Sequence, residues 1–550
     1  MRIGNPIARW RQRQLVRDLA SQIGRVEAYL EERETPIHSA GSPILFFNAS
    51  TRLHRLSLNA AFGLLASWAL RAERVPIVHL VCEAGMWPCV LGTDRRDPRT
   101  RPPCSPCQSL SGVLFPSDLV TSLPLDRGIH RQVMDELAGK SLQDLVAWKY
   151  RGRPLGELCL PSVRWILRRH HLPDSEPVRS VYRGYLASAA SLSVELATAL
   201  SRLAPRAIAL FNGIFYPEAL AREIAREFAI PVVTHEVGLA PNSAFFTRGE
   251  ASFRETPIVV GSRLGEEEDR ELDRYLEDRF RGSFTMAGIR FWKRMEAIPE
   301  WLQEKRRQFR QTVAVFTNVV FDTSQVHANT IFVDMFAWLD LLVEVVERHP
   351  ETLFVFRAHP DEDRPGKESQ ESVAAWFGRS SLPACRNAVF VEPKRPISSY
   401  ELVRTAKLVL VYNSSVGLEA SVLGVPVLCA GKARYTQVPS VFLAQDRGEY
   451  FRHLERFLEA ERIEVPLEFR QTARAFLHAE LFEASLDLSE FVEPLAEFPG
   501  MVALRRFEPE RLLHSRPLEQ IRSGFVDDAP FLLTQRSPSE SGERLAKGAT

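Results

Sequence analysis

Three polar residues with the chemistry to hold an anion follow a short apolar run near the middle of the second half of the chain. Asn413, Ser414 and Ser415 come directly after Leu408–Val411, an unbroken run that is typical of a strand buried on both faces of a parallel sheet. Asparagine and serine favour turns and helix N-caps. We expect a turn at the carboxyl end of a strand and at a helix N-terminus, where backbone amides favour an anion.

Glu419 adds a carboxylate to this turn. The spacing predicts a short helix over 416–423, with Gly424 as its stop. Glu419 stands four residues after Ser415, one position too far for a capping box, and so lies on the same helix face one turn deeper. Its carboxylate could accept hydrogen bonds from sugar hydroxyls; the alternative is an ordinary N-cap followed by a solvated glutamate.

Other polar residues follow neighbouring predicted strands of the same region. Thr317 and Asn318 come after Val313–Phe316, and Arg357 and His359 flank the end of the next strand. A cationic pair at that position could neutralise a diphosphate leaving group. The alternative is a surface arginine and a histidine that caps a turn.

A second set of polar residues follows strands earlier in the chain. Asn212 and Gly213 form a turn suited to sugar or phosphate contact, or a simple turn. His235 and Glu236 follow another buried run, and we expect the carboxylate of Glu236 to face a cleft. Either side chain could accept a proton from an acceptor hydroxyl as general base, and a structural role remains the alternative.

Four cysteines gather in an irregular, proline-rich stretch. They are Cys82, Cys89, Cys104 and Cys107. Four thiolates could close a structural zinc site, which leaves no open coordination position. A cysteine-ligated iron–sulfur cluster uses the same ligands, and free thiols are the third interpretation. No cofactor is expected to be needed for catalysis.

The elements that must position these residues alternate between strand and helix twice along the chain. This pattern predicts an α/β fold with two Rossmann-like domains facing each other across a cleft, with a helical insert and a C-terminal helical extension. The predicted divisions are an N-terminal helical arm (1–40), an N-terminal acceptor domain (41–285) with the cysteine loop (82–107), a connector helix (286–310), a C-terminal donor-binding domain (311–470), and a helical extension with a disordered tail (471–550).

Composition excludes several classes of protein. The 550 residues are 45% hydrophobic and 25% charged, as in ordinary globular domains. With 70 basic against 69 acidic residues, no overall field attracts nucleic acid. Because no apolar run approaches the roughly 18 residues of a membrane span, and no secretory signal follows the N-terminus, we expect a cytoplasmic protein, with peripheral contact to the inner membrane left open.

Several familiar nucleotide and catalytic motifs are missing from the sequence. There is no GxGxxG, no GxxxxGK[ST] and no GxSxG. The interpretations as a dinucleotide oxidoreductase, an ATPase and an α/β-hydrolase therefore lose most of their support.

The motifs that are present resemble those of a known family. Residues 412–420 (YNSSVGLEA), with 423–427 (LGVPV) and Ala430-Gly431, resemble the C-terminal domain of bacterial capsular-polysaccharide biosynthesis glycosyltransferases. That family is similar in turn to Kdo transferases and polyol-phosphate transferases of the GT-B fold. Residues 357–360 (RAHP) resemble the Arg/Lys-x-His-Pro element of the same group, and residues 235–246 resemble its acceptor-side loop.

The resemblance implies a metal-independent transferase that uses a nucleotide-activated donor. It implies that Ser414, Ser415 and Glu419 contact the nucleotide and ribose, that His359 contacts the diphosphate, and, less securely, that Glu236 is the general base. The cysteine loop and the helical insert depart from the family's pattern, which leaves the acceptor open.

We therefore expect a glycosyltransferase that moves a sugar or polyol phosphate from a nucleotide-sugar donor to a polysaccharide or glycolipid acceptor. One alternative is a nucleotide-sugar epimerase on the same fold, which needs no second substrate. Another is a non-catalytic protein that binds sugar nucleotides. The sequence leaves the donor, the anomeric outcome and the oligomeric state open.

Overall fold

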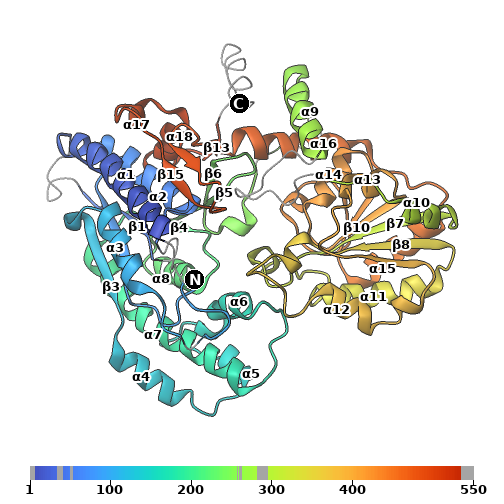
Figure 1. Ribbon diagram of the computed structural model, residues 1–550, viewed down its shortest axis with the longest axis horizontal. Coiled ribbons are helices and arrows are strands. Elements are labelled where there is room, and N and C mark those ends of the chain that lie inside the picture. Colours follow the sequence, from blue (N-terminus) through green and yellow to red (C-terminus); the bar gives the residue numbers. More distant parts are fainter. Residues whose placement is uncertain are drawn as a thin grey trace.

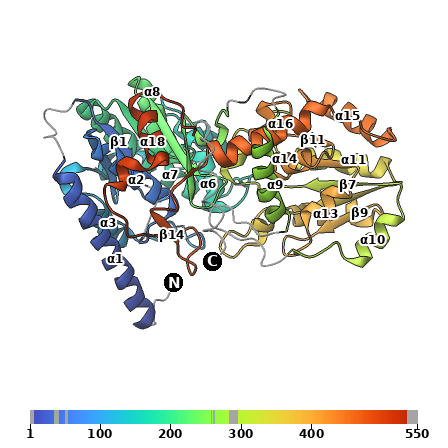
Figure 2. The ribbon, with the colours of Figure 1, turned by 90° about the horizontal axis from the view of Figure 1, so that it is seen from above.

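Two sheets organise the molecule, one on each side of it (Figure 1). The computed structural model describes residues 6–33, 41–49, 54–98, 100–256, 258, 263–281 and 295–533. We call the part built on the sheet of β1 the first half and the part built on the sheet of β7 the second half. Figure 2 shows the two halves from above, side by side.

The first sheet has seven strands in the order β13-β6-β5-β4-β1-β2-β3. Strands β1 to β5 pair in parallel, whereas β6 and β13 are antiparallel additions at one edge. The strands are β1 (Ile44–Phe47), β2 (Ile77–Glu83), β3 (Val120–Pro124), β4 (Ala207–Phe211), β5 (Val232–Val237), β6 (Ser243–Arg248) and β13 (Leu486–Asp487). The helices are α1 (Pro6–Glu31), α2 (Leu58–Ala72), α3 (Cys104–Leu114), α4 (Arg127–Glu136), α5 (Leu142–Val146), α6 (Leu155–Leu167), α7 (Glu176–Leu203) and α8 (Tyr216–Glu227).

The second sheet has six parallel strands in the order β12-β11-β10-β7-β8-β9. The strands are β7 (Gln311–Phe316), β8 (Thr352–Arg357), β9 (Ala388–Val391), β10 (Leu408–Val411), β11 (Val427–Cys429) and β12 (Phe442–Leu443). The helices are α9 (Glu266–Phe280), α10 (Glu300–Arg307), α11 (Met335–Arg348), α12 (Val373–Arg379), α13 (Ser399–Arg404), α14 (Val416–Val422), α15 (Arg447–Glu459) and α16 (Leu467–His478).

Both sheets are doubly wound and buried on both faces. Along β7, Val313 and Val315 enter one apolar core, whereas Ala314 and Phe316 enter another on the opposite face. This is why the strand sequences are continuously apolar rather than alternating. The strand order reverses between β1 and β4 and between β7 and β10, and such points are where ligands bind in sheets of this kind. The predicted fold class is confirmed.

The C-terminal segment returns from the second half to the first (Figure 1). After α16 the chain adds β13 to the first sheet, and α17 (Arg511–His514) and α18 (Arg516–Val526) pack on α2. The apolar residues Leu518, Ile521 and Phe525 of α18 lie in the same core as α2. The predicted helical extension thus contains strands as well as helices, and the chain beyond residue 533, which includes the predicted tail, lies outside the described residues.

Two predicted stretches differ in the structure. Residues 235–246 resemble an acceptor-side loop of the family, but Ser243–Arg248 form β6, antiparallel to β5. The positive φ of Asn242 turns the chain just before it. The stretch after 115, expected to be helical, contains the edge strand β3, whose pattern of partly exposed residues resembles that of a surface helix.

Helix α9 lies before the predicted domain boundary but packs on the second sheet. The division at residue 285 assigns it to the first half, yet Leu272 and Leu276 are buried in a core of the second sheet. Its charged sequence looked solvent-exposed because only one face is apolar. Among the helices in the described part of the chain, none is long and apolar enough to cross a membrane.

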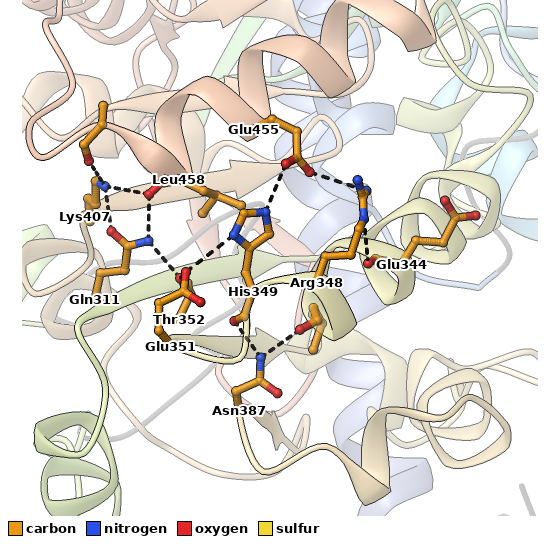
Figure 3. A network of polar contacts seen from close by, with 12 residues as sticks. Gln311, Glu344, Arg348, His349, Glu351, Thr352, Asn387, Lys407, Glu455 and Leu458 are labelled. Carbon is orange, nitrogen blue, oxygen red and sulfur yellow. Dashed lines mark hydrogen bonds and ion pairs between the residues drawn. The ribbon is translucent and has the colours of Figure 1, made fainter.

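A polar network ties together the amino-terminal ends of the second sheet (Figure 3). His349 lies 3.1 Å from Glu455 of α15, and Asn387 donates to the carbonyl of His349 at 3.0 Å. Lys407 donates to Gln311 at 2.6 Å. These side chains fix α11, α15 and the strand starts relative to one another, at the edge opposite the predicted site.

A buried carboxylate joins the two halves where the chain crosses back. Glu480 is 1% exposed and accepts hydrogen bonds from Arg254 and from Thr256 of the first half. Arg434 of the second half reaches the same carboxylate at 3.2 Å. Burial would raise the pKa of Glu480, but the charges of Arg254 and Arg434 and the hydrogen bonds outweigh it and lower the pKa.

We expect Glu480→Gln to destabilise the protein by about 3 to 5 kcal/mol, because removing one partner leaves buried arginine charge without compensation. The effect should appear as a lower midpoint of thermal unfolding at neutral pH. Since the pKa of Glu480 is lowered on folding, the difference from wild type should shrink as the pH falls through that lowered pKa. Glu468→Gln, at an exposed position on α16, is the matched control; equal midpoints for both variants would contradict the assignment.

Candidate active site

The predicted polar residues at the ends of β7 and β10 come together at the reversal point of the second sheet. Val411 pairs with Phe316, so the residues that follow these strands are neighbours. The backbone N–H of Asn413 donates to Oδ1 of Asn318 at 3.4 Å, and Thr317 donates to the carbonyl of Arg357. The structure therefore places Thr317, Asn318 and Asn413 along one edge.

The two serines of the turn differ in exposure and in what they bind. Ser414 is 7% exposed, and its carbonyl accepts a hydrogen bond from Tyr435 at 2.7 Å. Ser415 is exposed and precedes α14, and its hydroxyl accepts no capping hydrogen bond from the described residues of the first turn. The predicted side-chain cap is thus absent there, and the Ser415 hydroxyl faces solvent.

Glu419 is held by an arginine that the sequence did not reveal. It is 3% exposed, and its Oε1 accepts from Nε of Arg279 at 3.1 Å and also from Nη2. Arg279 ends α9 and donates to the hydroxyl of Tyr275 at 2.9 Å. The predicted alternative of a solvated glutamate is wrong. A ribose contact by Glu419 stays a prediction. To make that contact, the carboxylate would have to bind the ribose and Arg279 together, or lose its hydrogen bonds to Arg279.

Arg357 points to a neighbouring loop in this structure. Its terminal nitrogens donate to the carbonyls of Glu392 at 2.6 Å and Arg395 at 2.7 Å, and burial lowers the pKa of its guanidinium to about 10. These two hydrogen bonds hold the loop after β9 in place. A direct phosphate contact by Arg357 is a prediction that this geometry does not support.

His359 is oriented to donate a hydrogen bond from its Nε2 atom. Its Nδ1 accepts the backbone N–H of Asp361 at 3.1 Å, so in the neutral ring the proton resides on Nε2. Burial, more than any charge, lowers the pKa of this imidazole. A neutral histidine that donates through Nε2 suits an anionic oxygen.

Three further cations gather around the segment 360–367 that follows His359, and they were not predicted. Arg364 and Lys367 follow the short turn after His359, and Arg95 reaches over from the cysteine loop of the first half. Burial and the charge of Arg364 lower the pKa of Lys367, which Asp322 and Asp361 partly offset. Arg95 stacks on the ring of Trp165 at 4.0 Å and donates to the carbonyl of Gly366. These groups form a cluster suited to phosphate.

Glu236 stands at the end of β5 with its carboxylate oriented by three donors. Its Oε1 accepts from Nδ2 of Asn59 at 3.1 Å and from the N–H of Val237 at 2.8 Å; its Oε2 accepts from Nδ2 of Asn212 at 2.8 Å. Because a carboxylate offers about four lone-pair sites, Oε2 keeps one for a substrate hydroxyl. Burial raises the pKa of Glu236 despite these bonds.

His235 points to the opposite face of the strand. It is 5% exposed and packs against Phe246 with a centroid separation of 5.3 Å, and burial lowers its pKa to about 3. Its Nδ1 has no hydrogen-bond partner among the described residues. Because successive side chains of a strand point to opposite faces of the sheet, His235 must point inward when Glu236 points outward. A side chain buried in this way does not reach an acceptor hydroxyl in this conformation.

The turn at Asn212 and Gly213 is shaped by positive φ angles of 54° and 85°. Asn212 is 5% exposed, and its side chain is used to orient Glu236. Arg222 donates to the carbonyl of Gly213 and also to Glu250, both at 2.8 Å. The turn therefore supports the carboxylate rather than exposing its amide group. A direct sugar contact there stays a prediction.

A cavity of about 500 Å³ lies between the two halves. Its lining comes from the segment after β6 and from the loops after β7 and β11: Arg248, Glu250, Val326, His327, Asn329, Thr330 and Lys432. Across it His327 of the second half reaches Glu250 of the first at 3.0 Å. Both halves thus border a shared space.

The four predicted metal ligands also converge. Cys82, Cys89, Cys104 and Cys107 form no disulfide and line a single small cavity at the carboxyl end of β2. Cys159, Cys385 and Cys429 lie elsewhere.

A histidine and two carboxylates join the halves beside the cleft. His171, which follows α6 in the first half, lies 2.7 Å from Glu371 and 3.1 Å from Asp334 of the second half. Burial alone would lower the pKa of His171, but the hydrogen bonds and charges of Glu371 and Asp334 raise it.

Residues 289–450 match the family described as capsule polysaccharide biosynthesis protein. This stretch contains the loops after β7, β8 and β10, and the match confirms the family resemblance that the motifs there predicted. Protein FixF of Sinorhizobium fredii is 29% identical over 115 residues, which is 21% of this chain and 25% of FixF. The chain thus matches about a quarter of the length of that curated relative.

Solved structures with a similar arrangement include two kinds of enzyme. The beta Kdo 2,4 transferase of Thermosulfurimonas dismutans KpsC is 15% identical, with a TM-score of 0.32 over 51% of this chain and 80% of that one. The UDP-GlcNAc 2-epimerase of Neisseria meningitidis is 11% identical, with a TM-score of 0.23 over 79% and 98%.

We expect the contact between the halves to weaken as the pH rises. Because folding raises the pKa of His171, its stabilising contribution is complete below the ordinary histidine pKa and is lost as the pH rises through the folded value. The thermal midpoint of wild type should therefore exceed that of His171→Phe most at about pH 5, and the gap should close towards about pH 9. A gap that does not change with pH would show that the ion pairs with Glu371 and Asp334 do not form.

Proposed function

We propose that this protein is a glycosyltransferase that moves a sugar, or a polyol phosphate, from a nucleotide-activated donor to a surface-polysaccharide or glycolipid acceptor. The observation that carries the proposal is the opposite chemistry of the two halves. The first half holds an oriented carboxylate with a raised pKa, Glu236. The second half holds a cationic edge, formed by Arg364 and Lys367 beside the neutral imidazole of His359.

The cationic edge suits the departing nucleotide. In a transfer from a nucleotide-activated donor, negative charge develops on the leaving diphosphate or monophosphate. Lys367, Arg364 and the Nε2–H of His359 would stabilise that charge where the transition state needs it. The nucleotide itself would occupy the edge formed by Asn318 and Asn413.

The carboxylate suits activation of the acceptor. Glu236 would accept the proton of the acceptor hydroxyl through the free position on Oε2 as the new bond forms. A raised pKa lies closer to neutral pH, and this makes the carboxylate a better proton acceptor. Asn59 and Asn212 would hold it in orientation, and contact between the halves would exclude water, which competes as a nucleophile.

The test is the fate of nucleotide-activated donors. Wild type, incubated with candidate donors and a polysaccharide or glycolipid acceptor, should release nucleotide only when the acceptor is present. Glu236→Gln should lower kcat by roughly 100-fold or more, because general-base catalysis contributes about that much, with little change in donor affinity. Glu304→Gln, at an exposed position on α10, should match wild type.

Two results would contradict the proposal. An isomerised sugar nucleotide formed without an acceptor would identify an epimerase. Donor binding without turnover, unaltered by Glu236→Gln, would identify a non-catalytic binding protein.

A further inference from the structure

Four of the seven cysteines surround one cavity in the first half. The other lining groups are apolar or uncharged: Ala49, Ala84, Met86, Leu91, Pro102, Pro103 and Gln108. The proposed transfer reaction makes no use of this site. The gathering of four cysteines around it calls for another explanation.

Three separate pieces of chain deliver the sulfurs. Cys82 is near the end of β2, and Cys89 lies in the turn that follows. Cys104 and Cys107 occupy the first turn of α3, three residues apart and so on one helix face. The irregular segment between them returns to the same point, which gives the cysteine loop (82–107) its closed shape.

Backbone N–H groups point at two of the sulfurs. The amide of Gly85 donates to Sγ of Cys82 at 3.2 Å, and the amide of Gly92 donates to Sγ of Cys89 at 3.4 Å. Hydrogen bonds of this kind to ligating sulfur are one of the means by which proteins adjust iron–sulfur clusters.

Close packing keeps both glycines in place. A Cβ on Gly85 would stand 2.2 Å from the carbonyl oxygen of Leu123, and one on Gly92 would stand 3.0 Å from Cβ of Pro102. The two turns that aim these amides at sulfur therefore leave no room for a side chain.

The sulfurs are close neighbours without touching. All four line the same cavity. None of the four is in a disulfide. Within the described residues, only His170, His171 and Asp334 bring three potential ligand atoms within 4.8 Å of one another. No three of the four sulfurs are therefore that close.

This spacing is too wide for one zinc ion. Zinc–sulfur bonds of about 2.3 Å in a tetrahedron place the sulfurs about 3.8 Å apart. The cavity between them also has a volume of about 20 Å³, whereas four sulfurs around one ion leave no such space. A four-iron cluster holds one thiolate at each iron, on the outside of a cube, and so requires a wider set of sulfurs.

We propose that Cys82, Cys89, Cys104 and Cys107 bind a [4Fe–4S] cluster. The four cysteines supply one thiolate to each iron, and the apolar lining shields the cluster from water. The cluster pins the cysteine loop, which carries Arg95 to Trp165 and to the carbonyl of Gly366 in the second half. The site acts as a structural element beside the cleft.

The test is the metal content and spectrum of the full-length chain purified without oxygen. We expect about four irons and about four acid-labile sulfides per chain, and visible absorbance that bleaches with dithionite. Cys104→Ser and Cys107→Ser should each lose most of the iron. Cys385→Ser, a partly exposed cysteine of the second half, should keep it.

If wild type is isolated without metal, it is reconstituted anaerobically with ferrous iron and sulfide. The spectrum of the reconstituted wild type then tests for the cluster independently of how the variants fold. Recovery of the spectrum supports the cluster. One zinc per chain with no iron uptake, no metal uptake at all, or iron retained in both Cys104→Ser and Cys107→Ser would overturn it. Transferase activity plays no part in these measurements, so they can fail while the proposed function stands.

Discussion

The structure depends on one carboxylate that is buried between two arginines. Glu480 lies where the chain leaves the second half and returns to the first, and Arg254 and Arg434 approach it from opposite halves. An ionised carboxylate in such a place is tolerated only because both charges and Thr256 satisfy it. The pairing fixes how the halves meet, and hence how far the carboxyl-end loops of one sheet stand from those of the other.

Given that constraint, the division of chemistry between the halves follows from topology. Parallel strands end at the same edge of a sheet, so residues distant in sequence gather there without special arrangement. In the second half this edge collects His359, Lys367 and Asn413. In the first it collects Glu236 with its amide partners. The amino-terminal edges instead carry the network around His349, which holds the strands together.

Much of the grouping of residues at the strand ends could be predicted, because the ends of buried strands can be recognised in the sequence. Asn318 and Asn413 follow buried apolar runs, and the structure brings them within hydrogen-bonding distance. The pairing of Glu419 with Arg279 could not be predicted, since 140 residues separate them and no local pattern links the two. Strand β6 was missed because a proline and an asparagine before it suggested a loop. Lys367 was missed because its position depends on a turn without periodicity.

The central claim is that a nucleotide binds at the carboxyl-end edge of the second sheet. Hydrogen–deuterium exchange of the full chain, with and without a nucleoside diphosphate or monophosphate, tests it directly. The account predicts slower exchange in 318–325, 359–367 and 413–419, and unchanged exchange in 303–312 at the amino-terminal edge. Protection confined to 303–312, or no protection with any nucleotide tested, would contradict it.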